Sequence, residues 1–348
     1  MKKERLFYLD FIRALSMIII VIFHFNCTIN QERLLGNRIL PVLYANGDFG
    51  QIGVSLFFII SGASLMYAYE NKFSLIEYFK KRFIKLYPMF YIAYFGAFLY
   101  LFYISKSLPY VIPMIPKWTF IYTILGIDGY MINTLPDYYL LGEWFLGCIL
   151  FIYLLFPILR RIIIKYPKLL FMFGLVFYIM VVERYNSVIR IDWNFTTRIF
   201  DVLIGMYFIK YIKKISVYQF IFGLLISGIM LYRPLNITGM YKITIIGIAL
   251  FVTLVYIAQW ISNERTKNIF EKMSKYSYPV FLVHHIALGQ VVLHFRGATL
   301  RYIEVFFVLI ICCIVIGLTA FCLNNINDKL LQIFFAKREN ELSIVQKK

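Results

Sequence analysis

Apolar segments long enough to cross a lipid bilayer recur from one end of this sequence to the other. A helix needs roughly 17 to 25 mostly apolar residues to cross about 30 Å of hydrocarbon. We place such segments at 7–29, 50–70, 87–105, 141–160, 168–183, 197–212, 217–232, 242–261, 276–295 and 302–323. Hydrophobic residues make up 61% of the 348 residues, and the mean hydropathy of the whole chain is +0.75. The sequence therefore predicts an all-α, polytopic membrane protein with about ten transmembrane helices.

The distribution of positive charge predicts the orientation. Loops retained in the cytoplasm carry an excess of Lys and Arg. If both termini are cytoplasmic, 24 of the 36 Lys and Arg residues fall on the cytoplasmic side and 11 on the outer side. The cations lie in short clusters between apolar segments, so we interpret the net charge of +18 as topological and expect no nucleic-acid partner. The transmembrane domain is predicted at 1–325, followed by a cytoplasmic tail at 326–348.

Two other features bear on this topology. The apolar stretch at 116–128 is short and interrupted, which favours a re-entrant or interfacial segment over a span. The first apolar segment lacks a small-residue cleavage pattern, so we interpret it as a retained helix rather than a signal peptide.

The five cysteines have neither metal-ligand spacing nor a disulfide-like framework, and we predict no metal site.

The first apolar segment contains ionisable residues where a bilayer disfavours them. Asp10, Arg13 and His24 all lie in it, and a charge at a helix centre costs roughly 2.5–3.5 kcal/mol on insertion scales. Arg13 and His24 are 11 residues apart. At 100° per residue this is within about 20° of three full turns, so both lie on one face, roughly 16 Å apart along the axis. The spacing predicts a polar path along this helix.

Each of these residues also has a structural alternative. Asp10 precedes Arg13 by three residues, so the two are expected to pair at the start of the helix, where Arg13 could snorkel toward the interface. His24 could be a packing histidine that hydrogen-bonds locally. As a functional residue, it is the natural general base for a hydroxyl, because the unperturbed pKa of imidazole is about 6.5.

Further stretches follow in a fixed order along the chain. GVSLFFIISGASL at 53–65 contains Ser61, FKKRFIKLYP at 79–88 is basic, and RIFDVLIGM occupies 198–206. EWFLGCILFIYLLFP at 143–157 begins with an acidic residue and a tryptophan, and YSYPVFLVHH at 276–285 ends in two histidines. Small residues such as those at 61–63 allow close approach of a backbone or a ligand, and ordinary helix packing would use them equally well.

Together with the arginine and histidine of the first helix, these stretches resemble the acyltransferase 3 family of integral-membrane O-acyltransferases. The resemblance covers roughly residues 7 to 325. Ala63 stands where the family has an aromatic residue. The last basic position of the 79–88 stretch is Lys85 here, whereas the family has an arginine. The acidic residue that many relatives carry after the tryptophan is absent, and we do not assign that role to Glu143. The last motif maps to His284 rather than to His285.

The resemblance implies transfer of an acyl group, most often acetyl, from a cytoplasmic acyl-CoA to a hydroxyl of an extracytoplasmic polysaccharide or other glycan, in a bacterial inner membrane. It implies no metal. By the matching positions, the catalytic residues are His24 and Arg13, and the acetyl-CoA donor is bound by Lys81, Arg82 and Lys85. The residues assigned to the acceptor and to the polar lining are Asp10, Ser61, Arg198, Asp201 and His284.

Two other classes of function remain open at this point. Intramembrane charges also mark the permeation paths of transporters, here of a sugar or a lipid-linked glycan. The sequence lacks paired broken helices in corresponding halves, which are typical of inverted-repeat transporters. The third class is a non-enzymatic subunit of a glycan-assembly complex. In that class, changes at Arg13 and His24 would affect stability or assembly without revealing any activity.

Overall fold

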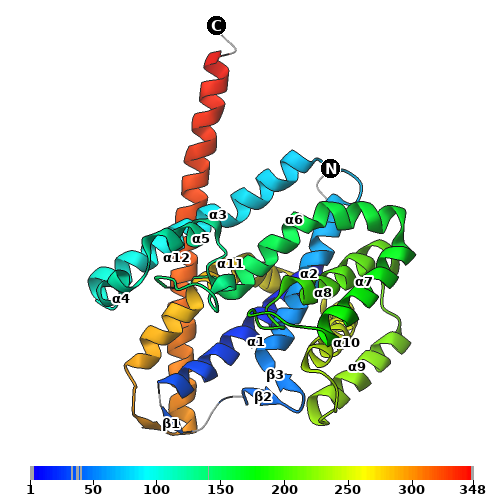
Figure 1. Cartoon of the computed structure of the whole chain (residues 1–348), viewed down its shortest axis with the longest axis horizontal. Helices are drawn as coiled ribbons and strands as arrows, with labels where there is room; N and C mark the ends of the chain where they lie inside the picture. The colour runs from blue at the N-terminus through cyan, green and yellow to red at the C-terminus, as the bar shows by residue number, and fades with distance from the viewer. Residues whose placement is uncertain (1–3, 33, 37–38, 40, 140, 346–348) are drawn as a thin grey trace.

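The chain folds into a bundle of helices with very little sheet (Figure 1). The computed structural model describes residues 4–345 apart from 33, 37–38, 40 and 140. Its α-helices are α1 (Phe7–Gln31), α2 (Phe49–Tyr69), α3 (Leu75–Leu99), α4 (Leu108–Val111), α5 (Phe120–Leu125), α6 (Glu143–Lys165), α7 (Pro167–Glu183), α8 (Phe195–Tyr207), α9 (Val217–Tyr232), α10 (Gly239–Ile261), α11 (Glu264–Leu293) and α12 (Tyr302–Val345). The all-α prediction is confirmed.

Four strands of two residues each make up the sheet among the described residues. β1 (Leu35–Gly36) pairs in parallel with β4 (Thr299–Leu300), and β2 (Leu43–Tyr44) pairs antiparallel with β3 (Gly47–Asp48). The first pair ties the segment after α1 to the segment before α12. Asp48 then caps α2, because its carboxylate accepts a hydrogen bond of 2.8 Å from the backbone N–H of Gln51.

Seven of the described helices are long and apolar enough to cross a membrane. They are α1, α2, α3 with its continuation to Ile104, α6, α10, α11 and α12 as far as Phe334. The predicted spans at 168–183, 197–212 and 217–232 correspond to α7, α8 and α9, which have 17, 13 and 16 residues. The chain is thus a multi-pass membrane protein, while the count of ten spans stays a prediction. In the interrupted stretch, α5 has six residues and is about 9 Å long, too short to cross.

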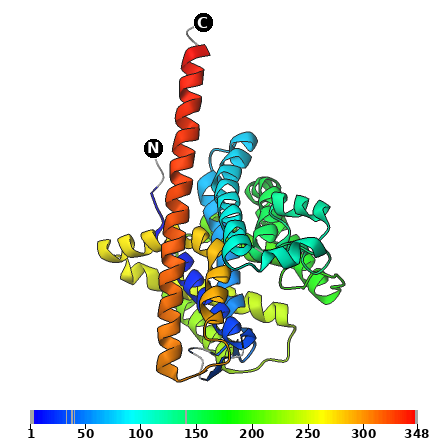
Figure 2. The same cartoon turned by 90° about the vertical axis from the view of Figure 1, so that its left-hand side faces the viewer.

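The longest helix, α12, projects well beyond the rest of the molecule (Figure 1). Its start lies beside β1, and in Figure 2 the chain that leads into α1 lies on the side of the molecule toward which α12 projects (Figures 1 and 2). This agrees with two termini on one side of the membrane, and the assignment of that side to the cytoplasm stays a prediction. The predicted domain boundary at 325 falls inside α12, so the tail begins as a continuation of this helix.

Small residues bring α2 and α8 together in the most extensive helix–helix contact of the fold. A Cβ added at Gly62 would lie 2.0 Å from the carbonyl oxygen of Val202, and one at Gly205 would lie 1.8 Å from the carbonyl oxygen of Ile59. The two backbones are therefore in direct contact, as small residues permit in membrane helices. Close packing accounts for Gly62, while its neighbour Ser61 is free to face another surface.

Candidate active site

A cavity of about 410 Å³ lies between α1, α2, α3, α6 and α11. Both residues predicted to share a polar path, Arg13 and His24, line it, as do Ser61 and Ser64 of α2. The 11-residue spacing in α1 therefore does place the cation and the imidazole toward one cavity. Neither side chain is separated from the other by packed core, which is the arrangement that a path along α1 requires.

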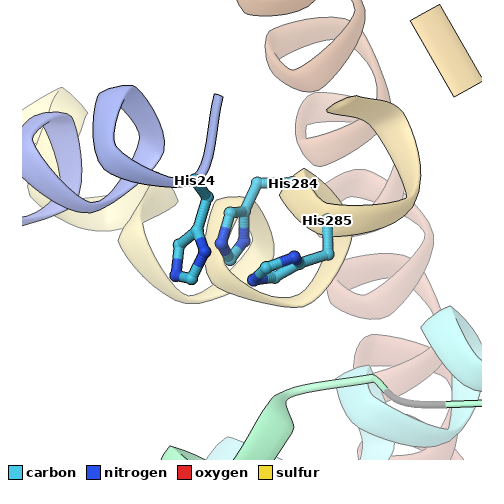
Figure 3. Close-up of side chains that lie close together, drawn as sticks. All are labelled: His24, His284 and His285. Carbon is cyan, nitrogen blue, oxygen red and sulfur yellow. The ribbon is translucent and has the colours of Figure 1, made fainter. Parts of the chain in front are cut away.

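Three imidazole rings meet at one end of this cavity. His24 comes from α1, and His284 and His285 come from α11 (Figure 3). The ring centroids of His24 and His285 are 4.1 Å apart, and those of His24 and His284 are 5.2 Å apart. The Nδ1 atom of His284 lies 2.8 Å from the carbonyl oxygen of Phe281, which identifies Nδ1 as the protonated nitrogen. Its Nε2 lone pair therefore points away from the helix backbone.

A carboxylate completes this cluster. Glu143, the first residue of α6, places Oε1 2.6 Å from Nε2 of His285 and Oε2 3.9 Å from Nε2 of His24. Its backbone has a φ of +43°, in the left-handed region that non-glycine residues rarely adopt. Strained backbone of this kind costs about 1–3 kcal/mol and tends to occur at functional sites. The N-terminus of α6 also favours a negative charge here.

Arg13 is held at the cavity wall by hydroxyl groups. Its Nη1 donates to Oγ of Ser274 at 2.9 Å, and its Nη2 donates to Oγ of Ser64 at 3.1 Å. Asp10 lies 3.5 Å from Nη1 of Arg13, yet its closer partner is Arg5, which donates to it at 3.0 Å. The predicted pairing of Asp10 with Arg13 is therefore shared with a second arginine, and the buried carboxylate of Asp10 lies behind the cavity wall.

The three predicted donor-binding residues separate into two groups. Arg82 and Lys85 line the large cavity, and Arg82 lies 5.7 Å from the ring centre of Tyr153. Lys81 does not line it. The Lys81 ammonium instead lies 3.5 Å from Glu77 at the surface and lines a smaller neighbouring cavity, to which Lys85 also contributes.

A second cavity, of about 190 Å³, adjoins the histidine cluster from the other side. His24 and Glu143 line both this cavity and the large one. Its other polar residues include Asp48, Gln51 and Arg190. Burial raises the pKa of Asp48 above its ordinary value, and the hydrogen bond from the Gln51 backbone partly offsets this. His24 and Glu143 therefore stand where two cavities meet.

Aromatic side chains form one wall of the smaller cavity. Trp193 and Trp144 both line it, and their rings stack with centroids 5.7 Å apart and an interplanar angle of 8°. The guanidinium of Arg190 lies 4.8 Å from the ring centre of Trp193. Such a wall, next to a carboxylate and an amide, suits a ligand with both an apolar face and hydroxyl groups.

Two predicted lining residues lie away from both cavities. Arg198 and Asp201 of α8 are fully buried and pair at 3.3 Å. The Nε of Arg198 donates to the carbonyl oxygen of Asp192 at 2.8 Å, and Oγ of Ser55 donates to Asp201 at 3.1 Å. Arg198 also hydrogen-bonds the side chain of Gln51, which does line the smaller cavity. The pair can thus hold the wall of that cavity without touching its contents.

The cluster also has donors of the kind that bind transition metals. One ligand atom from each of His24, His284 and His285 lies within 4.8 Å of the others, and Glu143 is adjacent. Glu143 and His285 already contact each other, because the Glu143 carboxylate lies 2.6 Å from Nε2 of His285. A bound metal would have to separate this pair, since ligands about 2 Å from zinc lie farther apart than 2.6 Å.

Comparisons with known proteins establish the family. A family model described as an acyltransferase domain matches residues 6–323. The chain belongs to the acyltransferase 3 family. It is also similar to acyltransferase MdmB of Streptomyces mycarofaciens, with 26% identity over 150 residues, which are 41% of this chain and 37% of that protein. The chain thus covers little more than a third of this relative. No solved structure matches the chain significantly.

The match to the acyltransferase 3 family confirms the resemblance inferred from the motifs, and it includes every helix that lines the two cavities. Sequence reasoning missed two members of the cluster, Glu143 and His285. The only signal for Glu143 was an acidic residue at the start of an apolar segment, and for His285 it was the histidine next to the matching one. Their contact joins α6 to α11, which no local pattern predicts.

Proposed function

We propose that this acyltransferase moves an acyl group, acetyl in the simplest case, from acyl-CoA to a hydroxyl of a glycan. The observation that carries the proposal is that His24 and Glu143 line both cavities. A donor in the larger cavity and an acceptor in the smaller one would meet at His24, so no acyl carrier on the protein is needed.

The larger cavity suits the donor. Arg5, Arg13, Arg82 and Lys85 all line it, and a cleft lined by cations attracts a polyanionic donor such as acyl-CoA. These residues belong to the side assigned to the cytoplasm by the charge distribution, where acyl-CoA is made. Arg13 lies between this cationic end and His24, which suits a role in positioning the thioester.

The smaller cavity suits a sugar acceptor. The rings of Trp144 and Trp193 form an aromatic wall, and the Asp48 carboxylate can accept hydrogen bonds from hydroxyl groups. In the step that we propose, His24 removes the proton of an acceptor hydroxyl as its oxygen attacks the thioester carbonyl. The carbon–sulfur bond breaks, an ester forms, and the coenzyme A thiolate leaves and takes up a proton. The Glu143 carboxylate stabilises the positive charge that His24 acquires, and His285 holds this carboxylate in place.

We place the protein in the inner membrane of a bacterium, with the acceptor on the extracytoplasmic side. A surface polysaccharide or a lipid-linked glycan would reach the smaller cavity from there. This localisation rests on the charge distribution and on the resemblance to surface-modifying relatives.

The test uses the purified full-length protein in lipid vesicles. Release of coenzyme A thiol from acetyl-CoA is measured with and without a glycan acceptor, and mass spectrometry follows acetyl on the glycan. We expect acceptor-dependent release that falls by about 10²- to 10⁴-fold in His24→Ala, the usual contribution of a general base. His294→Ala is the matched control, because His294 is an exposed histidine outside both cavities. Full activity in His24→Ala, or glycan transport without thiol release, would contradict the proposal.

A further inference from the structure

A third cavity adjoins the donor side of the large one. It has a volume of about 330 Å³ and lies between α3, α11 and α12. Lys85, Lys275 and Tyr278 line both cavities, so the two are neighbours. Residues of α12, which do not line the large cavity, form the far wall of this third cavity.

The α12 wall carries an unusual polar stretch. The helix is almost entirely apolar from Val305 to Leu323 and then reads NNIND at 324–328. Asn324 and Asn327 both line the third cavity and are only 4% and 6% exposed. Nδ2 of Asn324 donates to Asp328 at 2.9 Å, whereas Oδ1 of Asn327 has no hydrogen-bond partner in the described part of the chain. A buried amide oxygen left unpaired is costly, so a ligand that donates a hydrogen bond to it is favoured.

Cations surround these amides. Lys81, Lys85 and Lys275 line the cavity. Among the described residues, the carboxylates nearest to Lys81 and Lys275 are those of Glu77 at 3.5 Å and Asp328 at 3.7 Å, and more than half of each lysine side chain is exposed. Exposed ion pairs of this kind contribute little to stability. Phosphate groups can therefore replace the carboxylates as partners of the two lysines.

An amide among lysines has the groups needed to bind an adenine nucleotide. The carboxamide of Asn can accept from the N6 amino group of adenine and donate to N7. Resting on the proposed function, we propose that the third cavity binds the 3′-phosphoadenosine diphosphate end of acyl-CoA. Asn327 recognises the adenine, and Lys81 and Lys275 bind the phosphates. The pantetheine arm then passes Lys85 and Tyr278 into the large cavity and carries the thioester toward His24. This explains why Lys81 lies outside the large cavity.

The test compares acetyl-CoA with acetyl-1,N6-etheno-CoA, in which the N6 amino group is blocked. We expect the wild-type protein in vesicles to prefer acetyl-CoA in kcat/KM by about 5- to 150-fold, the range for a good bidentate contact with a base. Asn327→Ala should lose this preference by raising the KM for acetyl-CoA alone. Asn325→Ala, an adjacent asparagine that does not line the cavity, should retain it.

A second arm tests the phosphate contacts. Lys81→Ala should lose the preference for acetyl-CoA over acetyl-dephospho-CoA. Lys80→Ala removes the same charge from the preceding residue, which does not line the cavity, and should keep the preference. Activity with acetyl-CoA but unchanged preferences in both variants would overturn this inference and leave the proposed function standing. An effect that follows the anionic lipid content, with unchanged KM, would assign the cavity to a lipid headgroup and overturn it too. Absence of any reaction or binding with acetyl-CoA would overturn both proposals.

Discussion

Replacing Glu143 by glutamine tests the role of the carboxylate in the histidine cluster. The change keeps the shape of the side chain and removes the charge that lies 2.6 Å from His285 and 3.9 Å from His24. A contact of this kind with a charged partner is worth about 1.5–3 kcal/mol. If the charge acts fully in the transition state, kcat falls by about 10- to 150-fold, because 1.36 kcal/mol corresponds to a factor of ten.

The assay follows thiol release from acetyl-CoA in the presence of a glycan acceptor. The KM for acetyl-CoA should change little in Glu143→Gln. The carboxylate lies beside His24, at the opposite end of the large cavity from Lys85 and Lys275. His285→Gln should give a similar loss, and the double variant should be no worse than either alone, since both changes break one pair. Glu304→Gln is the matched control, because Glu304 pairs with Arg301 at the surface. A kcat for Glu143→Gln within twofold of the wild type would refute the reasoning.

Four further outcomes follow from the structure. Gly205→Ala should lower thermal stability in detergent by an amount equivalent to about 1–3 kcal/mol, since its Cβ would lie 1.8 Å from a carbonyl oxygen, whereas Gly228→Ala, with open space around it, should not. Arg13→Gln should raise the KM for acetyl-CoA and lower kcat, as read from initial rates, and unchanged values would remove it from the site. Activity should survive dialysis against a metal chelator, and loss restored by zinc would contradict a metal-free histidine cluster. Burial and nearby Asp128 raise the pKa of Asp137 to about 6, so its ionisation lowers stability as pH rises from about 4 through 6. Melting curves of Asp137→Asn should lack this fall.

Much of the fold was predictable because the bilayer imposes one strong rule on the sequence. Long apolar segments must be helices, and the helices from α1 to α12 that are long enough to span all fall on segments identified from hydropathy. The same rule is weak for short helices. α8 has 13 residues and contains the buried pair of Arg198 and Asp201, so tertiary contacts rather than apolar length account for its position.

The candidate site was predictable only where its members lie on one helix. Helical geometry relates Arg13 to His24, and the structure places both on one cavity. The contact between Glu143 and His285 joins residues 142 positions apart, and a backbone with positive φ aims the carboxylate. Neither the contact nor the backbone conformation has a local sequence signal. The division of the basic residues into two cavities likewise depends on where α12 packs, as Lys81 illustrates.

The most direct test of the account uses vesicles of defined orientation. Acetyl-CoA labelled in the acetyl group is supplied only on the side of the lysine-rich loops, and a glycan acceptor is trapped on the other side. The account predicts that label appears on the trapped glycan with the wild-type protein and with His294→Ala, but not with His24→Ala. Label that reaches the glycan equally well without His24, or only when donor and acceptor share one side, would contradict transfer at the junction of the two cavities.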